Sequence, residues 1–118
     1  MSDDAICRDA MRQVGLDPEL ERRVGQYSQG MRQRLSLARA VLHNPDLMLL
    51  DEPFSNVDAH SARDMAAILG RVRDQGKTIF VVTHQAPLME PVADEFVQMS
   101  AGQIVARETT RRTAGAAR

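Results

Sequence analysis

Apolar residues recur three and four positions apart in three stretches of the chain, and this spacing predicts helices with one buried face. The first predicted helix covers residues 4–14. The second begins after Ser28 as its N-cap and ends at His43-Asn44-Pro45, and the third covers about residues 59–74. A shorter helical segment is expected at residues 19–24. The apolar positions of the three helices are Ile6, Cys7, Met11 and Val14, then Met31, Leu35, Ala38 and Leu42, and finally Met65, Ile68, Leu69 and Val72.

Short apolar runs between and after these helices predict strands. Residues 47–50 are all apolar, and so short a run fits a strand buried on both faces, as in a parallel sheet. Residues 78–83 form the next strand, and the helix between the two runs predicts a βαβ unit with parallel strands and a right-handed crossover. A short helix near residues 87–92 then leads to a hairpin of residues 96–99 and 104–106. The expected fold class is therefore α/β.

The run of residues 47–50 ends abruptly in Asp51, Glu52 and Pro53. Open α/β sheets place their ligands beyond the carboxyl ends of the strands, so the two acids lie where a ligand is expected. One carboxylate can hold a magnesium ion through water, and its neighbour can orient or deprotonate an attacking water. Acids are also common after strands as solvated loop residues, so other motifs must decide between these interpretations.

Further motifs surround the acidic pair. Residues 27–31 read Tyr-Ser-Gln-Gly-Met, residues 55–58 read Ser-Asn-Val-Asp, and His84 follows the second predicted strand. In this order and spacing, the motifs resemble those of the ATP-binding subunit of ABC transporters, over roughly residues 22–108. The resemblance matches residues 27–31 to the family's signature loop, residues 47–51 to its Walker B strand, residues 55–58 to its D-loop and His84 to its switch histidine. It implies a partial P-loop NTPase domain with a parallel βαβ core, a remnant of the helical signature subdomain and a C-terminal β-hairpin.

The resemblance gives the signature loop a role in the site of a neighbouring subunit. Ser28, Gln29, Gly30 and Met31 would contact the γ-phosphate of ATP held by a second nucleotide-binding subunit in a head-to-tail dimer. The helix that follows has unsatisfied N–H groups and partial positive charge at its N-terminus, which favour an anion. The simpler alternative is that Ser28 only caps this helix. Gln29 and Met31 depart from the family's usual glycine and glutamine.

Within the chain's own site, the resemblance makes Asp51 the residue that holds Mg²⁺ through water and Glu52 the catalytic residue that polarises the attacking water. His84 would contact the γ-phosphate and help to hold Glu52 and the water in line. Asp58 would link the two sites across the dimer interface. Each residue has a simpler alternative, namely solvated acids for Asp51 and Glu52, a loop residue for His84 and a helix N-cap for Asp58.

The Gly-x4-Gly-Lys-Ser/Thr loop that cradles phosphates in P-loop ATPases does not occur in the sequence. The single lysine, Lys77, precedes a threonine, but Gly70 lies one residue too far upstream and a predicted strand, not a helix, follows. The resemblance therefore matches the chain to the C-terminal half of a nucleotide-binding domain. Residues 1–44 would form its helical signature region, and residues 45–108 would run from the Walker B strand past the switch histidine. We expect the isolated chain neither to bind ATP tightly nor to hydrolyse it.

A strand that the family places in the middle of its sheet is also missing. The resemblance puts this strand, which feeds the phosphate-binding loop, between residues 78–83 and residues 95–100. Without it two apolar strand edges lack a partner, and such edges favour aggregation, so we expect poor solubility or partial unfolding of the isolated chain. Residues 109–118 are rich in Thr, Ala and Arg without periodicity, and we expect a disordered tail there.

Composition excludes several other classes of protein. The net charge of −1, the 3% aromatic content and the absence of tryptophan argue against a nucleic-acid surface. The lone Cys7 cannot form an internal disulfide, and no Cys/His spacing suggests zinc. No apolar run approaches the ~20 residues that span a bilayer, and no signal peptide is visible. A membrane role therefore requires partners, which the resemblance supplies as transmembrane permease subunits that would hold the subunit at the cytoplasmic face of the membrane.

The resemblance implies that the whole domain couples ATP hydrolysis to transmembrane transport, with ATP and Mg²⁺ as its ligands. The Tyr-Ser-x-Gly-Met form of residues 27–31 favours an exporter. Two alternatives stay open. The chain could be a non-catalytic module that donates its signature loop to a partner's ATPase site. It could also belong to a soluble ABC protein of DNA repair or translation, although those carry long insertions between the motifs and the spacing here is compact.

Overall fold

The computed structural model describes residues 3–18 and 29–110, and these fall into two compact units that divide between His84 and Gln85. The first unit contains α1 (Asp3–Gln13), α2 (Gln29–Leu42), β1 (Leu47–Asp51), α3 (Ala59–Asp74) and β2 (Thr78–Val82). The second contains the short 3₁₀ helix η2 (Ala86–Met89) and the strands β3 (Glu95–Ser100) and β4 (Gln103–Thr109). The three long helices and four strands predicted from the sequence are confirmed. The helical segment predicted at residues 19–24 and the Ser28 cap lie outside the described residues.

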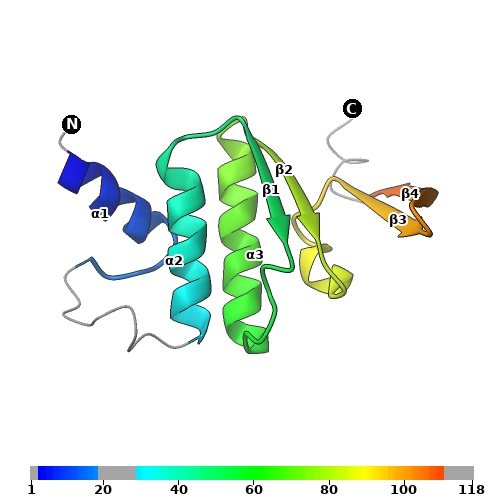
Figure 1. The fold of residues 1–118 in the computed structure, drawn as a ribbon, viewed down its shortest axis with the longest axis horizontal. Helices are drawn as coiled ribbons and strands as arrows, with labels where there is room; N and C mark the ends of the chain where they lie inside the picture. The colour runs from blue at the N-terminus through cyan, green and yellow to red at the C-terminus, as the bar shows by residue number, and fades with distance from the viewer. Residues whose placement is uncertain (1–2, 19–28, 111–118) are drawn as a thin grey trace. The chain divides into compact units, whose positions relative to one another are not determined.

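The first unit is built around the βαβ segment. β1 and β2 pair in parallel, with Leu47 opposite Thr78 and Asp51 opposite Val82, as the sequence predicted. α3 connects the two strands and packs against them, α2 lies beside α3, and α1 packs on α2 (Figure 1). The helices therefore cover one face of the strand pair.

The core of the first unit lies between these helices and the covered face of the strands. The spacing in α3 predicted its buried side chains correctly, whereas in α2 the buried pair is Leu37 and Ala38, and Leu35 is only partly buried. Phe54, in the loop after β1, was not predicted as a core residue, yet it is fully buried. The core side chains of this unit are Ala10, Val14, Leu16, Leu37, Ala38, Met48, Phe54, Ala62, Met65, Ala66, Ile68, Leu69 and Val72.

The prediction that β1 is buried on both faces is wrong for this chain. Leu47 and Leu49 are 51% and 72% exposed, and on β2 Phe80 and Val82 are 60% and 64% exposed. Side chains alternate along a strand, so these four residues share one face, while Met48 on the opposite face is only 4% exposed. The sequence of β1 is apolar on both faces, but the helices cover only one of them.

Replacing both Leu49 and Phe80 by lysine should raise the soluble yield of the isolated chain several-fold. A contiguous exposed apolar patch promotes self-association, and two like charges on it oppose that association. The soluble fraction and the particle mass by light scattering measure the effect. The matched control places lysines at Ala59 and Ala67, two exposed positions of α3, and should change little. Equal gains in both variants would show that added charge, and not the patch, controls solubility.

The second unit is an antiparallel hairpin. Glu95 pairs with Thr109 at one end of the hairpin and Ser100 pairs with Gln103 at the other, with an irregularity between Gln98 and Met99. Arg107 Nε donates to Glu95 Oε1 across the strands at 2.7 Å. The short helix predicted near residues 87–92 is the 3₁₀ helix η2.

The end of the hairpin corrects the predicted start of the tail. Thr109 closes β4, and Thr110 is buried. The Thr110 hydroxyl donates to the carbonyl of Ala93 at 2.6 Å, and its N–H donates to the carbonyl of Asp94 at 3.0 Å. The prediction of disorder is therefore wrong for Thr109 and Thr110, and residues 111–118 lie outside the described residues.

The helices of the described residues are short. The longest, α3, has 16 residues, and none is both long enough and apolar enough to cross a membrane.

Candidate functional site

The candidate site lies at the carboxyl ends of β1 and β2. Because the two strands are parallel, the residues that follow them meet at one edge of the sheet, and the structure brings together Asp51, Glu52 and His84 there. The Glu52 N–H donates to the carbonyl of Val82 at 2.7 Å, which extends the strand pairing by one residue. These three predicted site residues therefore lie together at one edge of the sheet, and their roles stay a prediction.

The Glu52 carboxylate is held by two donors from the end of β2. The Thr83 hydroxyl donates to Oε2 at 3.2 Å, and the backbone N–H of His84 donates to Oε1 at 2.5 Å. The His84 imidazole Nε2 lies 3.8 Å from the same Oε1. The Glu52 side chain is 27% exposed, whereas the His84 side chain is 98% exposed. The acid is thus fixed against the strand pair while the imidazole projects into open space.

The backbone of Glu52 is unusual as well. Its φ is +46°, in the left-handed region that residues with a Cβ rarely adopt. Such a conformation costs on the order of 1–3 kcal/mol and persists only where surrounding contacts enforce it, which happens often at functional sites. Here the backbone bond to Val82 and the two bonds to the carboxylate enforce it.

Asp51 differs from Glu52 in its surroundings. It is the last residue of β1, and its side chain is exposed. Carboxylate oxygen is a ligand type that Mg²⁺ prefers. Among the residues that the structure describes, no group of three His, Cys, Asp or Glu side chains is placed to hold a metal ion. The chemistry of the exposed Asp51 carboxylate therefore fits contact with Mg²⁺ through a water ligand of the ion.

Asp58 caps α3. Its carboxylate accepts from the N–H of Ser61 at 2.8 Å and from the Ser61 hydroxyl at 3.1 Å. The backbone hydrogen bond from Ser61, followed by the hydroxyl bond, lowers the pKa of Asp58 below its ordinary value of 3.8. The capping alternative for Asp58 is therefore observed, and its predicted role across a dimer interface stays a prediction.

Replacing Asp58 by alanine should lower the thermal midpoint of unfolding, while Asp58→Asn should retain most of the stability because asparagine is an equally good N-cap. The folded-state pKa of Asp58 is depressed, so the ionised cap contributes stability above pH 3.8, and this contribution is lost as the pH falls through the folded-state pKa. The difference in unfolding free energy between wild type and Asp58→Asn should therefore shrink as the pH falls below the folded-state pKa of Asp58. Circular dichroism melts across the acid range measure it, and a difference that is constant with pH would contradict the capping assignment.

The predicted signature loop is only partly described. Ser28 lies outside the described residues, and Gly30 and Met31 lie in the first turn of α2. The side chain of Gln29 is not described. Gln33 Nε2, one turn further along α2, donates to the carbonyl of Ser55 at 3.3 Å and so links this end of α2 to the loop after β1.

Arg34 fixes α2 to its neighbours. Its guanidinium donates to the carbonyl of Val14 at 3.2 Å and to the carboxylate of Asp64 in α3, also at 3.2 Å. Gly15 makes room for the Arg34 guanidinium, because a Cβ at residue 15 would lie 2.5 Å from Arg34 Nη1. The φ of Gly15 is +78°. Arg34 therefore joins α2 to α3 and to the segment after α1.

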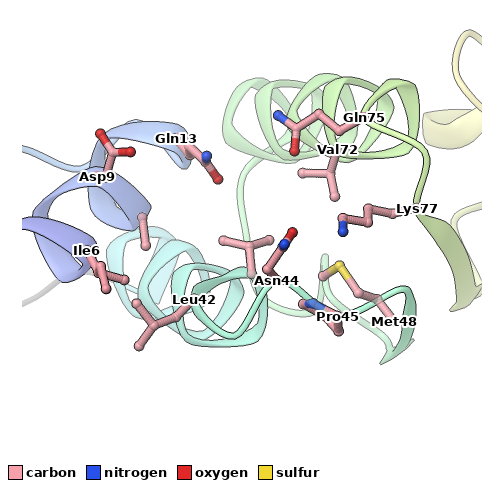
Figure 2. Close-up of a pocket in the computed structure, with 12 residues that line it drawn as sticks. Ile6, Asp9, Gln13, Leu42, Asn44, Pro45, Met48, Val72, Gln75 and Lys77 are labelled. Atoms are coloured by element: carbon pink, nitrogen blue, oxygen red, sulfur yellow. The ribbon is translucent and has the colours of Figure 1, made fainter. Parts of the chain in front are cut away.

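A cavity of about 360 Å³ lies at the other end of the strands (Figure 2). It is lined by residues from α1, the end of α2, the start of β1 and the end of α3, among them Asp9, Met48 and Val72. Lys77 also lines it and forms an ion pair with Asp46 at 3.6 Å. Among the described residues, none of those predicted for the site lines this cavity, so the cavity is separate from the strand-end site.

Sequence reasoning missed Thr83 and Gln33 as parts of the site. Thr83 stands directly after β2, and a hydroxyl at the end of a strand parallel to β1 was a readable signal. The contact of Gln33 with Ser55 depends on how α2 packs beside the loop, which has no local signature in the sequence.

Comparison with known proteins supplies the context for this geometry. A family model described as ABC transporter matches residues 2–55. The chain is 39% identical over 100 residues to a putative ABC transporter ATP-binding protein of Archaeoglobus fulgidus, covering 85% of this chain and 34% of that protein. It is also 36% identical over 96 residues to a fluoroquinolones export ATP-binding protein of Mycobacterium tuberculosis, and this match covers 81% of this chain and 32% of that protein.

Solved structures agree on the fold. A dimeric bacterial ABC transporter cassette superposes with a TM-score of 0.80 at 24% identity, covering 94% of this chain and 50% of the cassette. A nucleotide-free ATP-binding cassette superposes with a TM-score of 0.83 at 20% identity, and the match covers 95% of this chain and 44% of the cassette. The chain thus spans about a third of these curated relatives and about half of the solved cassettes. With the strand-end acids and the parallel βαβ core, these matches show that the chain belongs to the ABC transporter ATP-binding family.

Proposed function

We propose that the chain forms the hydrolytic end of the ATP-binding unit of an ABC transporter. One observation carries the proposal: the Glu52 carboxylate is held by Thr83 and His84 at the carboxyl ends of two parallel strands, on a backbone in a strained conformation. A fixed acid at this edge of the sheet is suited to orienting a water molecule beside a phosphate.

The proposed roles are those that the resemblance to the family gives to the strand-end residues and to the signature loop. Glu52 accepts a proton from the attacking water as the water oxygen bonds to the terminal phosphorus and the bond to the leaving diphosphate breaks. The exposed ring of His84 contacts the terminal phosphate beside Glu52. Asp51 holds Mg²⁺ through water, and when bound the ion neutralises charge on the phosphates. Ser28, Gln29, Gly30 and Met31 serve the ATP of a second subunit, and Asp58 lies at that interface.

The partners in this proposal are transmembrane permease subunits and a second nucleotide-binding subunit in a head-to-tail dimer. Two relatives support transport as the process, because the Mycobacterium protein is named for fluoroquinolone export and a Halalkalibacterium halodurans protein, 33% identical over 99 residues, is named for manganese transport. The proposed location is the cytoplasmic face of the membrane, with attachment through the permease. An exporter is the proposed type, based on residues 27–31.

The isolated chain should show no low-micromolar binding of a fluorescent ATP analogue. Charge-assisted hydrogen bonds to a phosphate contribute roughly 1.5–3 kcal/mol each, so the three or so that a phosphate-binding loop supplies amount to about 5–9 kcal/mol. Without them the affinity falls by more than about a thousandfold. Fluorescence titration measures this, with the intact Archaeoglobus relative as the positive control. Low-micromolar affinity of the isolated chain would contradict the proposal.

Reconstitution tests the function itself. We define the complementary segment as the part of the Archaeoglobus relative that precedes its match to this chain. Mixing the chain with this segment, produced as a separate polypeptide, should give ATP-dependent release of phosphate that neither polypeptide gives alone. A mixture whose two polypeptides co-elute on size exclusion but release no phosphate would refute the proposed function.

A further inference from the structure

We infer that Thr83 is a positioning residue for Glu52, and that its hydroxyl, together with the backbone N–H of His84, sets the orientation of the carboxylate. Because Glu52 is the proposed general base, this role of Thr83 rests on the proposed function. The catalytic group is Glu52 itself, and Thr83 acts only through it.

The geometry assigns one donor to each carboxylate oxygen. Thr83 Oγ1 lies 3.2 Å from Glu52 Oε2, and the backbone nitrogen of His84 lies 2.5 Å from Glu52 Oε1. A carboxylate offers about four lone-pair directions, so two such bonds leave acceptor positions for a water molecule. Both donors come from the residues directly after β2, whereas the acid follows β1.

This arrangement ties the acid to the strand pair. A glutamate side chain has three rotatable bonds and samples several rotamers when nothing holds it. With a donor on each oxygen, the carboxylate plane is fixed by the parallel register that puts Asp51 opposite Val82. Misplacement of a catalytic group by about 1 Å can lower a rate by about a hundredfold. The strand register places Thr83 beside Glu52, and the Thr83 hydroxyl in turn keeps the carboxylate in position for catalysis.

The His84 side chain does not replace this contact. Its Nε2 lies 3.8 Å from Glu52 Oε1, beyond hydrogen-bond distance, and the ring is 98% exposed. Thr83 and the His84 backbone therefore hold the acid, and the imidazole is left to contact a substrate.

Three substitutions test the inference in the reconstituted mixture of the chain and the complementary segment. Thr83→Val removes the hydroxyl at nearly constant shape and should lower kcat about tenfold with KM for ATP unchanged. Thr83→Ser keeps a hydroxyl and should restore most of the rate. Thr78→Val, the same change at the start of β2 and away from the site, should leave the rate as in wild type. A wild-type kcat in Thr83→Val would overturn the inference.

Amide hydrogen exchange of His84 in the chain alone gives a readout that needs no activity. Loss of the Thr83 hydroxyl frees the carboxylate, so the His84 amide should exchange several-fold faster in Thr83→Val than in Thr83→Ser or wild type. If the two wild-type polypeptides co-elute but release no phosphate, the proposed function fails and this exchange measurement alone decides whether Thr83 holds Glu52. Equal exchange of the His84 amide in Thr83→Val and wild type would overturn the inference.

Discussion

Replacing Phe54 by alanine should destabilise the chain strongly and lower its midpoint of urea denaturation. Phe54 is 0% exposed and is among the largest fully buried side chains of the described residues. Truncation of a buried phenylalanine costs about 3–5 kcal/mol, because the apolar contacts are lost and a cavity remains. This loss shifts the equilibrium between folded and unfolded chain by a factor of roughly 100 to 1,000 or more. It is a large share of the about 5–15 kcal/mol by which a small domain is stable.

Phe80→Ala is the matched control because it makes the same chemical change at a residue that is 60% exposed. A surface substitution of this kind usually changes stability by less than about 0.5 kcal/mol. Urea denaturation followed by circular dichroism at 222 nm measures both variants. Similar midpoints for Phe54→Ala and Phe80→Ala would show that the core around Phe54 does not hold the unit together.

The burial of Phe54 also matters for the site, since Phe54 lies two residues after Glu52 in the sequence. The N–H of Ser55 donates to the carbonyl of Glu52 at 3.2 Å, and the N–H of Val57 donates to the carbonyl of Phe54 at 3.3 Å. These turns reverse the chain after β1 and direct Phe54 into the core. The buried ring therefore anchors the loop in which Glu52 keeps its left-handed backbone.

The helices and strands could be predicted from the sequence because their signals are local. α3 was predicted at about residues 59–74, the bounds that the structure gives, because its apolar residues recur at regular helical spacing. The burial of β1 on both faces could not be predicted correctly, because an apolar residue such as Leu49 does not reveal what covers it. That information depends on packing between distant segments.

The site was predictable to a similar depth. Asp51 ends β1, and Glu52 and His84 come just after β1 and β2, so the rule that parallel strands share a carboxyl edge brings the three together. The left-handed backbone of Glu52 and its bond to Thr83 depend on register and rotamer, which no local pattern encodes. For Asp58 the sequence left two alternatives, and a carboxylate that caps α3 can still face a partner subunit.

The second large effect is expected for Glu52→Gln in the reconstituted mixture of the chain and the complementary segment. The amide is close in size to the carboxylate but cannot accept a proton from the attacking water. General-base catalysis contributes typically 10²–10⁴-fold, so the rate of phosphate release should fall by at least about a hundredfold. Binding of ATP should persist, because the proposed contact of Glu52 is with the water and not with the phosphates. Phosphate release and binding of the fluorescent ATP analogue, measured on the same mixture, separate the two effects.

Glu90→Gln is the control for Glu52→Gln, since it makes the same change at an exposed residue of the second unit. It should leave phosphate release unchanged. If Glu52→Gln released phosphate at the wild-type rate, water activation would have to come from another group, and the strained backbone and paired donors at Glu52 would require a structural explanation. If Glu52→Gln instead lost ATP binding together with hydrolysis, the acid would act on the nucleotide or its metal. The loss of hydrolysis relative to the loss of ATP binding therefore assigns Glu52 either to the water or to the phosphates.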